Sequence, residues 1–414
     1  MRDPPAVNDA RSPTAARLLT AGAIREHCGE IASWVEAGQS PHFAWHAERL
    51  PAAAAYVAEV IGERYPGLGV PYHSRWRHFE AGGVDRWAGL AERGALSAEP
   101  MRLERARVRI DLVIPSVLLD AGAGTAWRYR EPGTGATLSR SEGLAVASLA
   151  LFASGALSSD PARPLSSDAA ALSRIGPEAI AQAFQVSPDN PLVGIEGRAA
   201  LLARLGAVIA GEPAVFGSPA RLGNLVDALL ARSSGGRIEA AELLGMLLRV
   251  LGPVWPGRLQ LDGVALGDCW AHPAASGGLV PFHKLTQWLT YSLLEPLEEA
   301  GLAITGLDAL TGLPEYRNGG LLLDLEVLEA REASFHSRAL RVDEPAVVEW
   351  RAMTVVGLDR MAPLVRSLLG VDAKAFPLAR MLEGGTWAAG RKIAAARRAG
   401  GAPPVRIVSD GTVF

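Results

Sequence analysis

Residues 281–324 read PFHKLTQWLTYSLLEPLEEAGLAITGLDALTGLPEYRNGGLLLD, and the rest of the chain is expected to organise around this stretch. Its first half predicts a helix, because Pro281 stands near the first turn and Gly301 just past the end. An apolar stripe that should face the core runs along this helix at Leu285, Leu289 and Leu293. Helical patterns recur along the chain, so the sequence predicts a mainly α protein with a few short β-hairpins.

Polar and aromatic residues share a second face of the same helix, at Lys284, Gln287, Trp288 and Tyr291. Such a face often lines a pocket, although Lys284 could also be an ordinary solvated residue. The chain has 41 Lys+Arg but only three lysines. A lysine that persists in so arginine-rich a chain is a candidate for chemistry that needs a compact, tunable ammonium.

The motif LPEYRNGG, residues 313–320, is predicted to be a loop bounded by proline and glycine. It offers a carboxylate, a phenol, a guanidinium and an amide on consecutive residues: Glu315, Tyr316, Arg317 and Asn318. Loops held by a rigid scaffold concentrate binding chemistry, which makes this motif a candidate site. The alternative is a plain surface turn.

A second polar and aromatic cluster lies at 72–78, with Tyr72, His73, Arg75, Trp76 and Arg77 among its members. Arginine offers a fork of donors to an oxyanion and histidine adds another, so the cluster could bind phosphate. The alternative is an amphipathic segment that buries Trp76.

Asp111 lies in an otherwise apolar helix. It is either a hydrogen-bonded structural acid or a carboxylate with a tuned pKa, and the structural role is favoured.

Composition excludes several classes of protein. Hydrophobic residues make up 49% of the 414, enough for a real core, and the net charge of −3 gives no field for nucleic acid or an anionic membrane. Two cysteines suit a reducing, cytoplasmic compartment and exclude a disulfide framework. The longest apolar run, 143–157, is short for a membrane span and predicts a buried helix.

The predicted organisation is a disordered tail at 1–11, a helical N-terminal part at 12–160 and a helical C-terminal part at 165–414, together forming one continuous unit. A helix over 97–119 is expected to break at Pro115. Ser139 and Glu142 give a capping-box start to the next helix. Asp262-Gly263, flanked by alternating apolar residues, predicts a β-hairpin.

No cofactor signature is present, because the sequence contains no phosphate loop, dinucleotide fingerprint, HExxH or GxSxG motif. Asp268, Cys269 and His272 could ligate a metal, but they are loosely spaced and have no second cluster. Neither a metal nor a cofactor is therefore expected. Acid–base and electrostatic chemistry by carboxylates, lysine, arginine and tyrosine remains.

Three motifs together resemble a bacterial and fungal uracil-catabolism family, first defined as a domain of unknown function: YHSRWRHFEAGG (72–83), PFHKLTQWLTYSLLEPLE (281–298) and LTGLPEYRNGG (310–320). The likeness covers the chain from about Leu18 to about Leu382. It implies a step after uracil has become a nucleotide and its ring has been opened, in which urea is released from ribose phosphate.

The run from Lys284 to Arg317 is more distantly similar to the queuosine-salvage nucleotide N-glycosidases. That similarity implies a fold like that of the helix-hairpin-helix DNA glycosylases. Lys284 and Gln287 match the lysine and glutamine of those proteins, and Glu315-Tyr316-Arg317 matches their Asp-Tyr-Arg motif with Glu for Asp. Their helix aspartate falls at Ser292 here, which leaves Asp324, Asp111 or Asp120 to supply a second carboxylate.

The resemblance implies a division of roles. Cleavage of a ribosyl C–N bond builds positive charge on the sugar, which a carboxylate can stabilise while it orients or deprotonates water. Glu315 is predicted for that role, with Asp324 as a further catalytic candidate. Lys284, Tyr316 and His283 are candidate proton donors to urea. Arg317, with Arg75, Arg77 or His73, would hold the phosphate, and Gln287 and Asn318 would read sugar hydroxyls or the ureido group.

Two other functions remain open. The protein could be an amidohydrolase that cuts within the ureido group, or a non-catalytic sensor or scaffold that binds the nucleotide intermediate. The partner expected in every case is a small ribose-phosphate compound, without nucleic acid or membrane.

Overall fold

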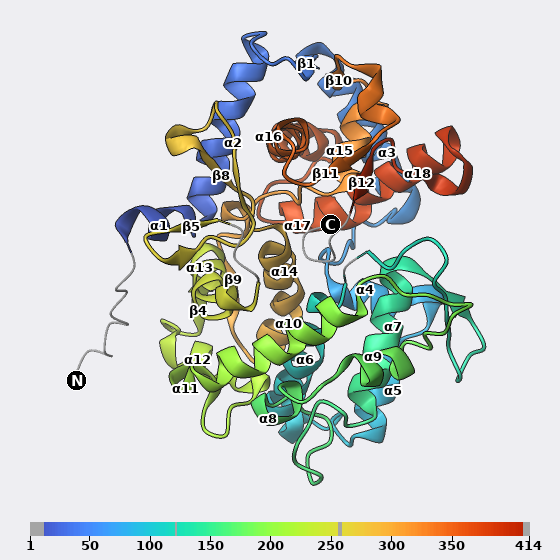
Figure 1. Ribbon diagram of the computed structural model, residues 1–414, viewed down its shortest axis with the longest axis vertical. Coiled ribbons are helices and arrows are strands. Elements are labelled where there is room, and N and C mark those ends of the chain that lie inside the picture. Colours follow the sequence, from blue (N-terminus) through green and yellow to red (C-terminus); the bar gives the residue numbers. More distant parts are fainter. Residues whose placement is uncertain (1–11, 121, 256–258, 409–414) are drawn as a thin grey trace.

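The computed structural model describes residues 12–120, 122–255 and 259–408, and within these ranges the protein is mainly α-helical, as predicted (Figure 1). The expected disordered tail, 1–11, lies outside the described residues. Across the ranges that are described, no helix combines the length and the apolar character that a membrane crossing requires.

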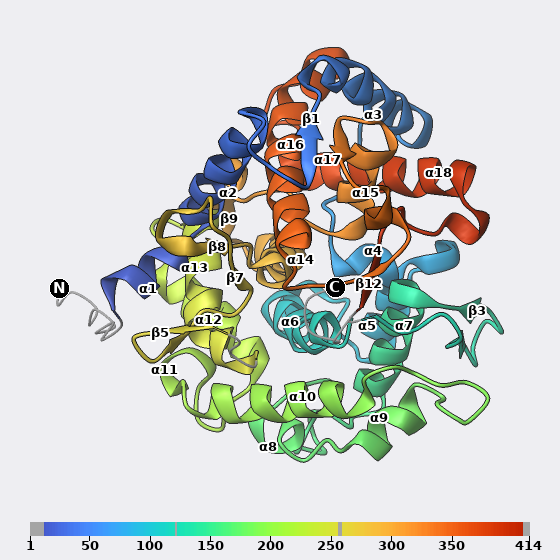
Figure 2. The same ribbon diagram turned by 45° about the horizontal axis from the view of Figure 1, so that its top comes forward.

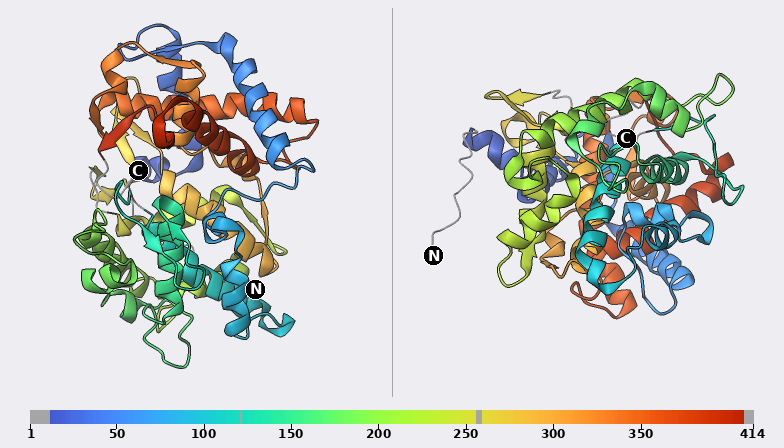
Figure 3. Two further views of the ribbon diagram at one scale, coloured as in Figure 1. Left: turned by 90° about the vertical axis from the view of Figure 1, so that its right-hand side faces the viewer. Right: turned by 90° about the horizontal axis from the view of Figure 1, so that it is seen from below.

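The helices form two groups, stacked along the long axis of the molecule, with α14 (Lys284–Glu299) and α4 (Arg75–Phe79) between them (Figures 1 and 3). The upper group contains α2 (Ala21–Glu36), α3 (Leu50–Arg64), α15 (Tyr316–Asp324), α16 (Pro345–Leu369), α17 (Leu378–Met381) and α18 (Trp387–Arg397). The lower group contains α5 (Arg86–Arg93), α6 (Arg102–Leu118), α7 (Arg140–Ala153), α8 (Ala169–Leu172), α9 (Pro177–Ala183), α10 (Ile195–Ala210), α11 (Pro213–Phe216) and α12 (Leu225–Arg232). Along one side lie α1 (Pro13–Leu18) and α13 (Ala240–Leu251).

The strands are short and pair two by two. Four pairs are antiparallel: β1 (Phe43–Trp45) with β10 (Leu328–Ala330), β2 (Tyr129–Arg130) with β3 (Thr137–Leu138), β5 (Gln260–Leu261) with β6 (Val264–Ala265), and β7 (Cys269–Ala271) with β8 (Leu279–Pro281). Two are parallel: β4 (Arg237–Glu239) with β9 (Ala303–Thr305), and β11 (Ala339–Arg341) with β12 (Arg406–Val408). The β5–β6 hairpin is the predicted one, since Asp262 and Gly263 both take the positive φ that a tight hairpin turn needs.

The first and last thirds of the chain share one end of the molecule. Helix α16 packs against both α2 and α3, and α14 packs against α6. A single hydrophobic core runs through all these elements. The predicted N-terminal and C-terminal parts thus interlock, and a boundary at 160–165 stays a prediction.

Helix α14 lies at the centre of the molecule (Figure 2) and begins at Lys284, three residues later than Pro281. Pro281 instead ends strand β8, and His283 leads into the helix in a left-handed conformation with a φ of 48°. The stripe residues Leu289 and Leu293 are fully buried, as expected, but so are Gln287 and Tyr291 on the polar face. The helix is therefore enclosed on nearly every side.

Three prolines lie inside helices of the described ranges without ending them: Pro115, Pro296 and Pro363. Pro115 was expected to interrupt α6, and that prediction is wrong, because the Asp111 carbonyl oxygen that Pro115 leaves without a helical donor accepts a 2.7 Å hydrogen bond from the Ser167 hydroxyl. Pro296 in α14 frees the carbonyl oxygen of Ser292 in the same way. In α6 and α14 a side chain from another part of the chain, Ser167 or Trp76, supplies the missing donor.

The motif LPEYRNGG is not a loop throughout, because α15 begins at Tyr316. Glu315 is its N-cap, and the glycine pair lies inside the helix. A Cβ atom on Gly319 would stand 2.6 Å from the Trp350 ring, and one on Gly320 would stand 2.9 Å from Pro404. The glycines therefore serve close packing between elements and do not form a turn.

Candidate active site

Four charged side chains approach one another where helices from both groups meet. Lys284 opens α14, Glu315 caps α15, Asp120 follows the end of α6, and Arg75 opens α4. The charges of Glu315 and Asp120 both raise the pKa of Lys284. The charges of Arg75 and Lys284 both lower the pKa of Asp120. We call these four residues the acid–lysine cluster.

Lys284 is held by its main chain, which leaves its ammonium available. Its backbone N–H donates a 2.9 Å hydrogen bond to Asp268 Oδ2, and Asp268 is fixed by two contacts of 2.8 Å from Arg351. Within the described ranges the ammonium makes no ion pair closer than 4.0 Å. Burial lowers the pKa of Lys284, against the opposing effects of Glu315 and Asp120. A lysine in this state donates its proton more readily than one in water.

The other two lysines support this distinction. Lys374 is exposed, and Lys392 is exposed in an ion pair of 2.6 Å with Glu63. Lys284 is thus the lysine that the fold partly buries, and a chemical need for its ammonium stays a prediction.

Glu315 has a structural role as well as a possible chemical one. Its two carboxylate oxygens accept hydrogen bonds from the backbone N–H groups of Arg317 (2.8 Å) and Asn318 (2.6 Å), which caps α15. Burial raises the pKa of Glu315, and the two N–H donors, Lys284 and His73 act against that rise. A buried carboxylate with a raised pKa is a stronger proton acceptor than an exposed one.

Asp120 is the carboxylate that the structure brings to this cluster. Its carboxylate lies 2.9 Å from Arg75 Nη1. Burial acts to raise the pKa of Asp120, but Arg75, His78 and Lys284 outweigh it and hold the pKa below its ordinary value. The two carboxylates of the cluster are therefore pushed in opposite directions, the arrangement that separates an acid–base group from a permanently charged one.

The other two aspartates considered for this role lie elsewhere. Asp111 accepts hydrogen bonds from Arg221 (2.7 Å) and the Gly223 backbone N–H (2.8 Å), the structural role that the sequence favoured. Asp324 is bound by Arg398 at the far end of α15 from Glu315.

Arg75 is fully buried and only partly satisfied. Its Nε donates to Ser116 Oγ at 2.8 Å, and its Nη1 contacts Asp120 and the Ser141 carbonyl oxygen. Its Nη2 is buried and has no hydrogen-bond partner among the described residues. A buried guanidinium N–H without an acceptor is costly, so this donor is suited to receive a ligand oxygen.

Glu383, which the sequence pattern did not single out, borders the cluster together with His73 and His78. Glu383 Oε2 lies 2.8 Å from His73 Nδ1, and Glu383 belongs to a π-helical turn, Leu382–Thr386. Single π-turns in helices are frequent at functional sites. Burial, and then Arg75, lower the pKa of His78 to about 4, which keeps its ring neutral. Two adjacent glycines, Gly384 and Gly385, are the only local sign of the π-turn, and they do not identify it.

Several predicted site residues are occupied by structural contacts. Gln287 bonds to the Thr311 main chain and hydroxyl, and Tyr291 donates to the Thr311 carbonyl oxygen at 2.8 Å. His283 contacts the Leu18 carbonyl oxygen, and Tyr72 donates to Glu298. These side chains hold α14 and its neighbours in place and do not meet the acid–lysine cluster.

The remaining predicted residues lie around the cluster. Tyr316 is half-buried. Burial raises the pKa of its phenol, and the charges of Glu315 and Asp120 act in the same direction. Arg317 donates to the Gly401 carbonyl oxygen at 2.9 Å, and Asn318 keeps a buried Oδ1 without a partner among the described residues. Arg77 is turned toward Glu295, at 2.9 Å. Trp76 belongs to the core, as its alternative interpretation held.

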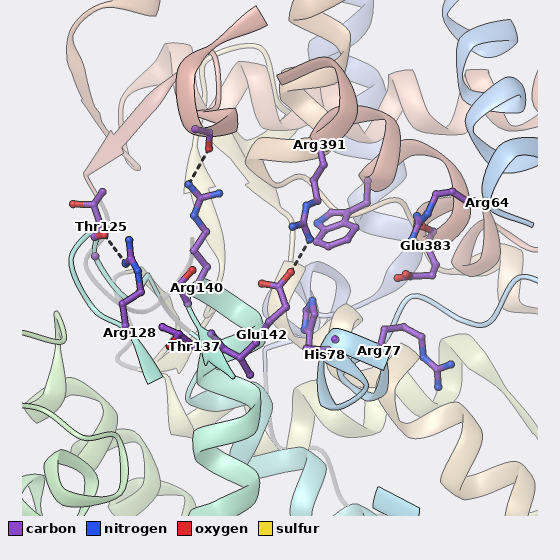
Figure 4. Close-up of a pocket in the computed structure, with 17 residues that line it drawn as sticks. Arg64, Arg77, His78, Thr125, Arg128, Thr137, Arg140, Glu142, Glu383 and Arg391 are labelled. Atoms are coloured by element: carbon purple, nitrogen blue, oxygen red, sulfur yellow. Dashed lines mark hydrogen bonds and ion pairs between the residues drawn. The ribbon is translucent and has the colours of Figure 1, made fainter. Parts of the chain in front are cut away.

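A cavity of about 570 Å³ opens beside this region, between α4, α7 and α18 (Figure 4). Its charged lining consists of Arg64, Arg77, Arg128, Arg140, Arg391, Glu142 and Glu383. His78 and Trp387 also line it, and the His78 ring lies 3.4 Å from Arg75 Nη1. The cavity therefore reaches within one residue of the acid–lysine cluster.

The possible metal ligands form no metal site. Asp268 is saturated by Arg351, Trp270 and the N-terminus of α14, and Cys269 and His272 are buried beside it. No group of three or more His, Cys, Asp or Glu side chains in the described ranges is arranged to hold a metal ion.

Fold and site together define a mainly α protein in which a lysine, two carboxylates and an arginine are buried beside an arginine-lined cavity. The chain belongs to the family described as "Protein of unknown function (DUF1688)", whose model matches residues 17–414. It is 39% identical over 407 residues to a protein of Schizosaccharomyces pombe called "Protein urg3", with 97% of this chain and 99% of that protein covered. It is 37% identical over 429 residues to "Uracil catabolism protein 4" of Lachancea kluyveri, with 94% and 97% covered.

Proposed function

We propose that this protein is an N-ribosyl hydrolase of uracil catabolism, which releases urea from a ureido-ribose phosphate. The name of the Lachancea kluyveri relative supports the pathway. The observation that carries the reaction is that the charges of both Glu315 and Asp120 act on buried Lys284, while the pKa values of these two carboxyl groups are shifted in opposite directions.

Asp120 is suited to stabilise the sugar as its C–N bond breaks. The transition state for loss of a ribosyl nitrogen resembles an oxocarbenium ion, which carries positive charge. Arg75 keeps Asp120 ionised, because it holds the pKa of that carboxyl low. A fixed negative charge in a buried site stabilises a developing cation more strongly than it would in water.

Glu315 and Lys284 are suited to move the protons. Glu315, whose pKa burial raises, takes a proton from the attacking water. Lys284, whose pKa burial lowers, gives a proton to the departing urea nitrogen. Water thus supplies the hydroxyl group on the anomeric carbon and, through these two groups, the proton that lets urea leave neutral.

The direct test is incubation of the purified protein with ribosylurea 5′-phosphate. Urea and ribose 5-phosphate should appear in equal amounts. Ammonia or carbon dioxide in their place would indicate an amidohydrolase, and tight binding without any turnover would indicate a sensor or scaffold.

Glu315→Gln tests the assigned base and needs a matched control, because Glu315 also caps a helix. Asp168 offers that control, since its carboxylate likewise accepts two backbone N–H groups, from Ala171 (3.0 Å) and Ser159 (2.5 Å), at the N-cap of α8. Asp168→Asn should keep full turnover, whereas Glu315→Gln should lose about 100-fold or more in kcat. Similar activities of the two variants would remove Glu315 from the mechanism.

A further inference from the structure

The cavity beside the acid–lysine cluster is strongly cationic. Five arginines and two glutamates line it. Both glutamates already have cationic or histidine partners: Glu142 lies 2.6 Å from Arg391, and Glu383 lies 2.8 Å from His73. Arg77 is likewise paired, with Glu295 outside the lining.

Arg128 and Arg140 differ from these paired residues. Arg128 donates only to the carbonyl oxygens of Thr125 (2.8 Å) and Trp127 (2.7 Å), and Arg140 makes one long contact of 3.4 Å to the Gly400 carbonyl oxygen. Within the described ranges neither guanidinium has a carboxylate within 4.0 Å. Figure 4 shows the two side chains on the same side of the cavity, reaching in the same direction.

The start of α7 adds further donors on that side. Thr137, Ser139 and Arg140 all line the cavity, and Ser139 is the N-cap of this 14-residue helix. The helix starts where it was predicted to start, but the predicted capping box is not formed, because the Ser139 side chain makes no capping hydrogen bond. The Glu142 side chain reaches Arg391, outside α7. A helix N-terminus that lacks its side-chain cap attracts an anion.

We propose that Arg128 and Arg140, with the N-terminus of α7, form the binding site for the phosphate monoester of the substrate. This assignment rests on the proposed function and places the phosphate at the cavity wall, with the sugar extending past His78 toward Asp120. It replaces the expectation that Arg317, with Arg75, Arg77 or His73, holds the phosphate. Arg317 donates to the Gly401 carbonyl oxygen, and Arg77 and His73 are paired with Glu295 and Glu383. Arg75 pairs with Asp120 and offers a ligand oxygen only its Nη2.

Phosphate suits this site for two chemical reasons. Arginine donates two parallel hydrogen bonds to a phosphate, and such charge-assisted bonds are about twice as strong as neutral ones. Arg128 and Arg140 now donate to neutral carbonyl oxygens, so exchanging these acceptors for a dianion is favourable. The neutral sugar alone offers no such gain, and the site therefore selects the phosphorylated compound.

Binding can be measured without turnover by titration calorimetry with ribose 5-phosphate, ribose and inorganic phosphate as separate probes. Ribose 5-phosphate should bind at least about 10-fold more tightly than ribose, because only the phosphate accepts charge-assisted hydrogen bonds from the two arginines. The double variant Arg128→Met with Arg140→Met should lose that preference. Arg128→Lys with Arg140→Lys should recover only part of it, because lysine lacks the fork.

Arg130→Met is the matched control. Arg130 is exposed on the neighbouring strand β2, and no contact of its side chain is found in the described ranges. Arg130→Met removes one arginine charge that lies outside the proposed site, and it should leave ribose 5-phosphate affinity unchanged. Circular dichroism and thermal unfolding test whether each variant is folded. If the double methionine variant unfolds, the double lysine variant still tests the site.

The possible outcomes separate this inference from the proposed function. Loss of ribose 5-phosphate binding in the double variant, in a protein that never releases urea, would keep the site and overturn the function. Urea release with an unchanged KM in the double variant would keep the function and overturn the site. Equal affinity for ribose and ribose 5-phosphate, or binding of inorganic phosphate that the double variant does not weaken, would also overturn the site.

Discussion

The indole N–H of Trp76 donates a 2.8 Å hydrogen bond to the main-chain carbonyl oxygen of Ser292. The hydroxyl of the same serine accepts a 3.0 Å hydrogen bond from the backbone N–H of Arg75. One residue of α14 thus fixes two consecutive residues of α4, and with them the guanidinium of Arg75 beside Asp120. Ser292, where the resemblance suggested an aspartate, is used here to anchor the arginine, and we propose that Asp120 supplies the second carboxylate.

Trp76→Phe should destabilise the fold by about 1–3 kcal/mol, because it leaves a buried carbonyl oxygen without a donor. Pro296→Ala supplies the missing helical N–H to that oxygen. Urea unfolding of the two single variants and the double variant measures the coupling free energy between Trp76 and Pro296. Trp76→Phe should cost clearly less in the Pro296→Ala background, and equal costs would show that the freed carbonyl is not the reason for the bond.

Lys284→Met should lower kcat about 100- to 10,000-fold, the range for removal of a general acid, and should change stability little. The backbone N–H that bonds Asp268 survives in the variant. Lys392→Met serves as the control, because it removes a lysine that lies in an exposed ion pair. Steady-state release of urea measures kcat of both variants, and thermal unfolding measures their stability. Full activity in Lys284→Met would show that another group donates the proton.

The pH profile of kcat should be a narrow bell. Glu315 must be deprotonated to accept a proton, and since its pKa is raised the acid limb should lie above the ordinary value of about 4.3. Lys284 must be protonated, and since its pKa is lowered the alkaline limb should lie below about 10.4. In Lys284→Arg the alkaline limb should move up, because guanidinium stays protonated. An alkaline limb that remains in that variant would belong to some other residue.

Asp120→Asn should abolish most turnover and should also destabilise the fold by about 3–5 kcal/mol, since it leaves Arg75 buried without a counter-charge. Asp324→Asn is the informative comparison, because it breaks a carboxylate–arginine pair at the other end of α15. Asp324 was itself predicted to be catalytic. Retained kcat in Asp324→Asn, beside a loss in Asp120→Asn, would assign the second carboxylate to Asp120, and the reverse result would assign it to Asp324.

Gly319→Ala should lower the free energy of unfolding by about 1–3 kcal/mol, because the added methyl group would meet the Trp350 ring and the Thr354 hydroxyl. Gly29→Ala tests the same change in α2, where a Cβ meets nothing within 4 Å. That variant should stabilise the protein by about 0.5–1 kcal/mol through helix propensity. Equal effects of the two variants would contradict close packing as the reason for the glycine.

The helices were predictable where apolar spacing decides them, and their ends were not. Gly301 was expected just past the end of α14 and lies there with a φ of 94°. The break predicted at Pro115 was wrong, because a side chain distant in sequence can bind the carbonyl oxygen that an interior proline frees, as also happens at Pro296. The donors that bind these oxygens, Ser167 and Trp76, lie 56 and 216 residues away in sequence, and single-chain spacing does not reveal them.

The site was only partly predictable, because some of its residues depend on partners that are distant in sequence. Lys284 stood out by lysine scarcity and Glu315 by its motif, and both belong to the cluster. Asp120 remained one of three aspartates because its role depends on Arg75, 45 residues earlier in the chain by their numbers. The predicted helix face at Gln287 and Tyr291 has the right spacing for a pocket, but the Thr311 segment covers it.

The interlocking of α2 and α3 with α16 bears on how this chain is made. Arg25 of α2 finds its partner Asp359 334 residues later, so the ribosome completes the N-terminal helices long before their neighbour exists. Their apolar faces stay open during that interval and invite aggregation. We therefore expect the nascent chain to need protection from aggregation until the last quarter emerges, and we expect a product truncated before α16 to leave the apolar faces of α2 and α3 exposed.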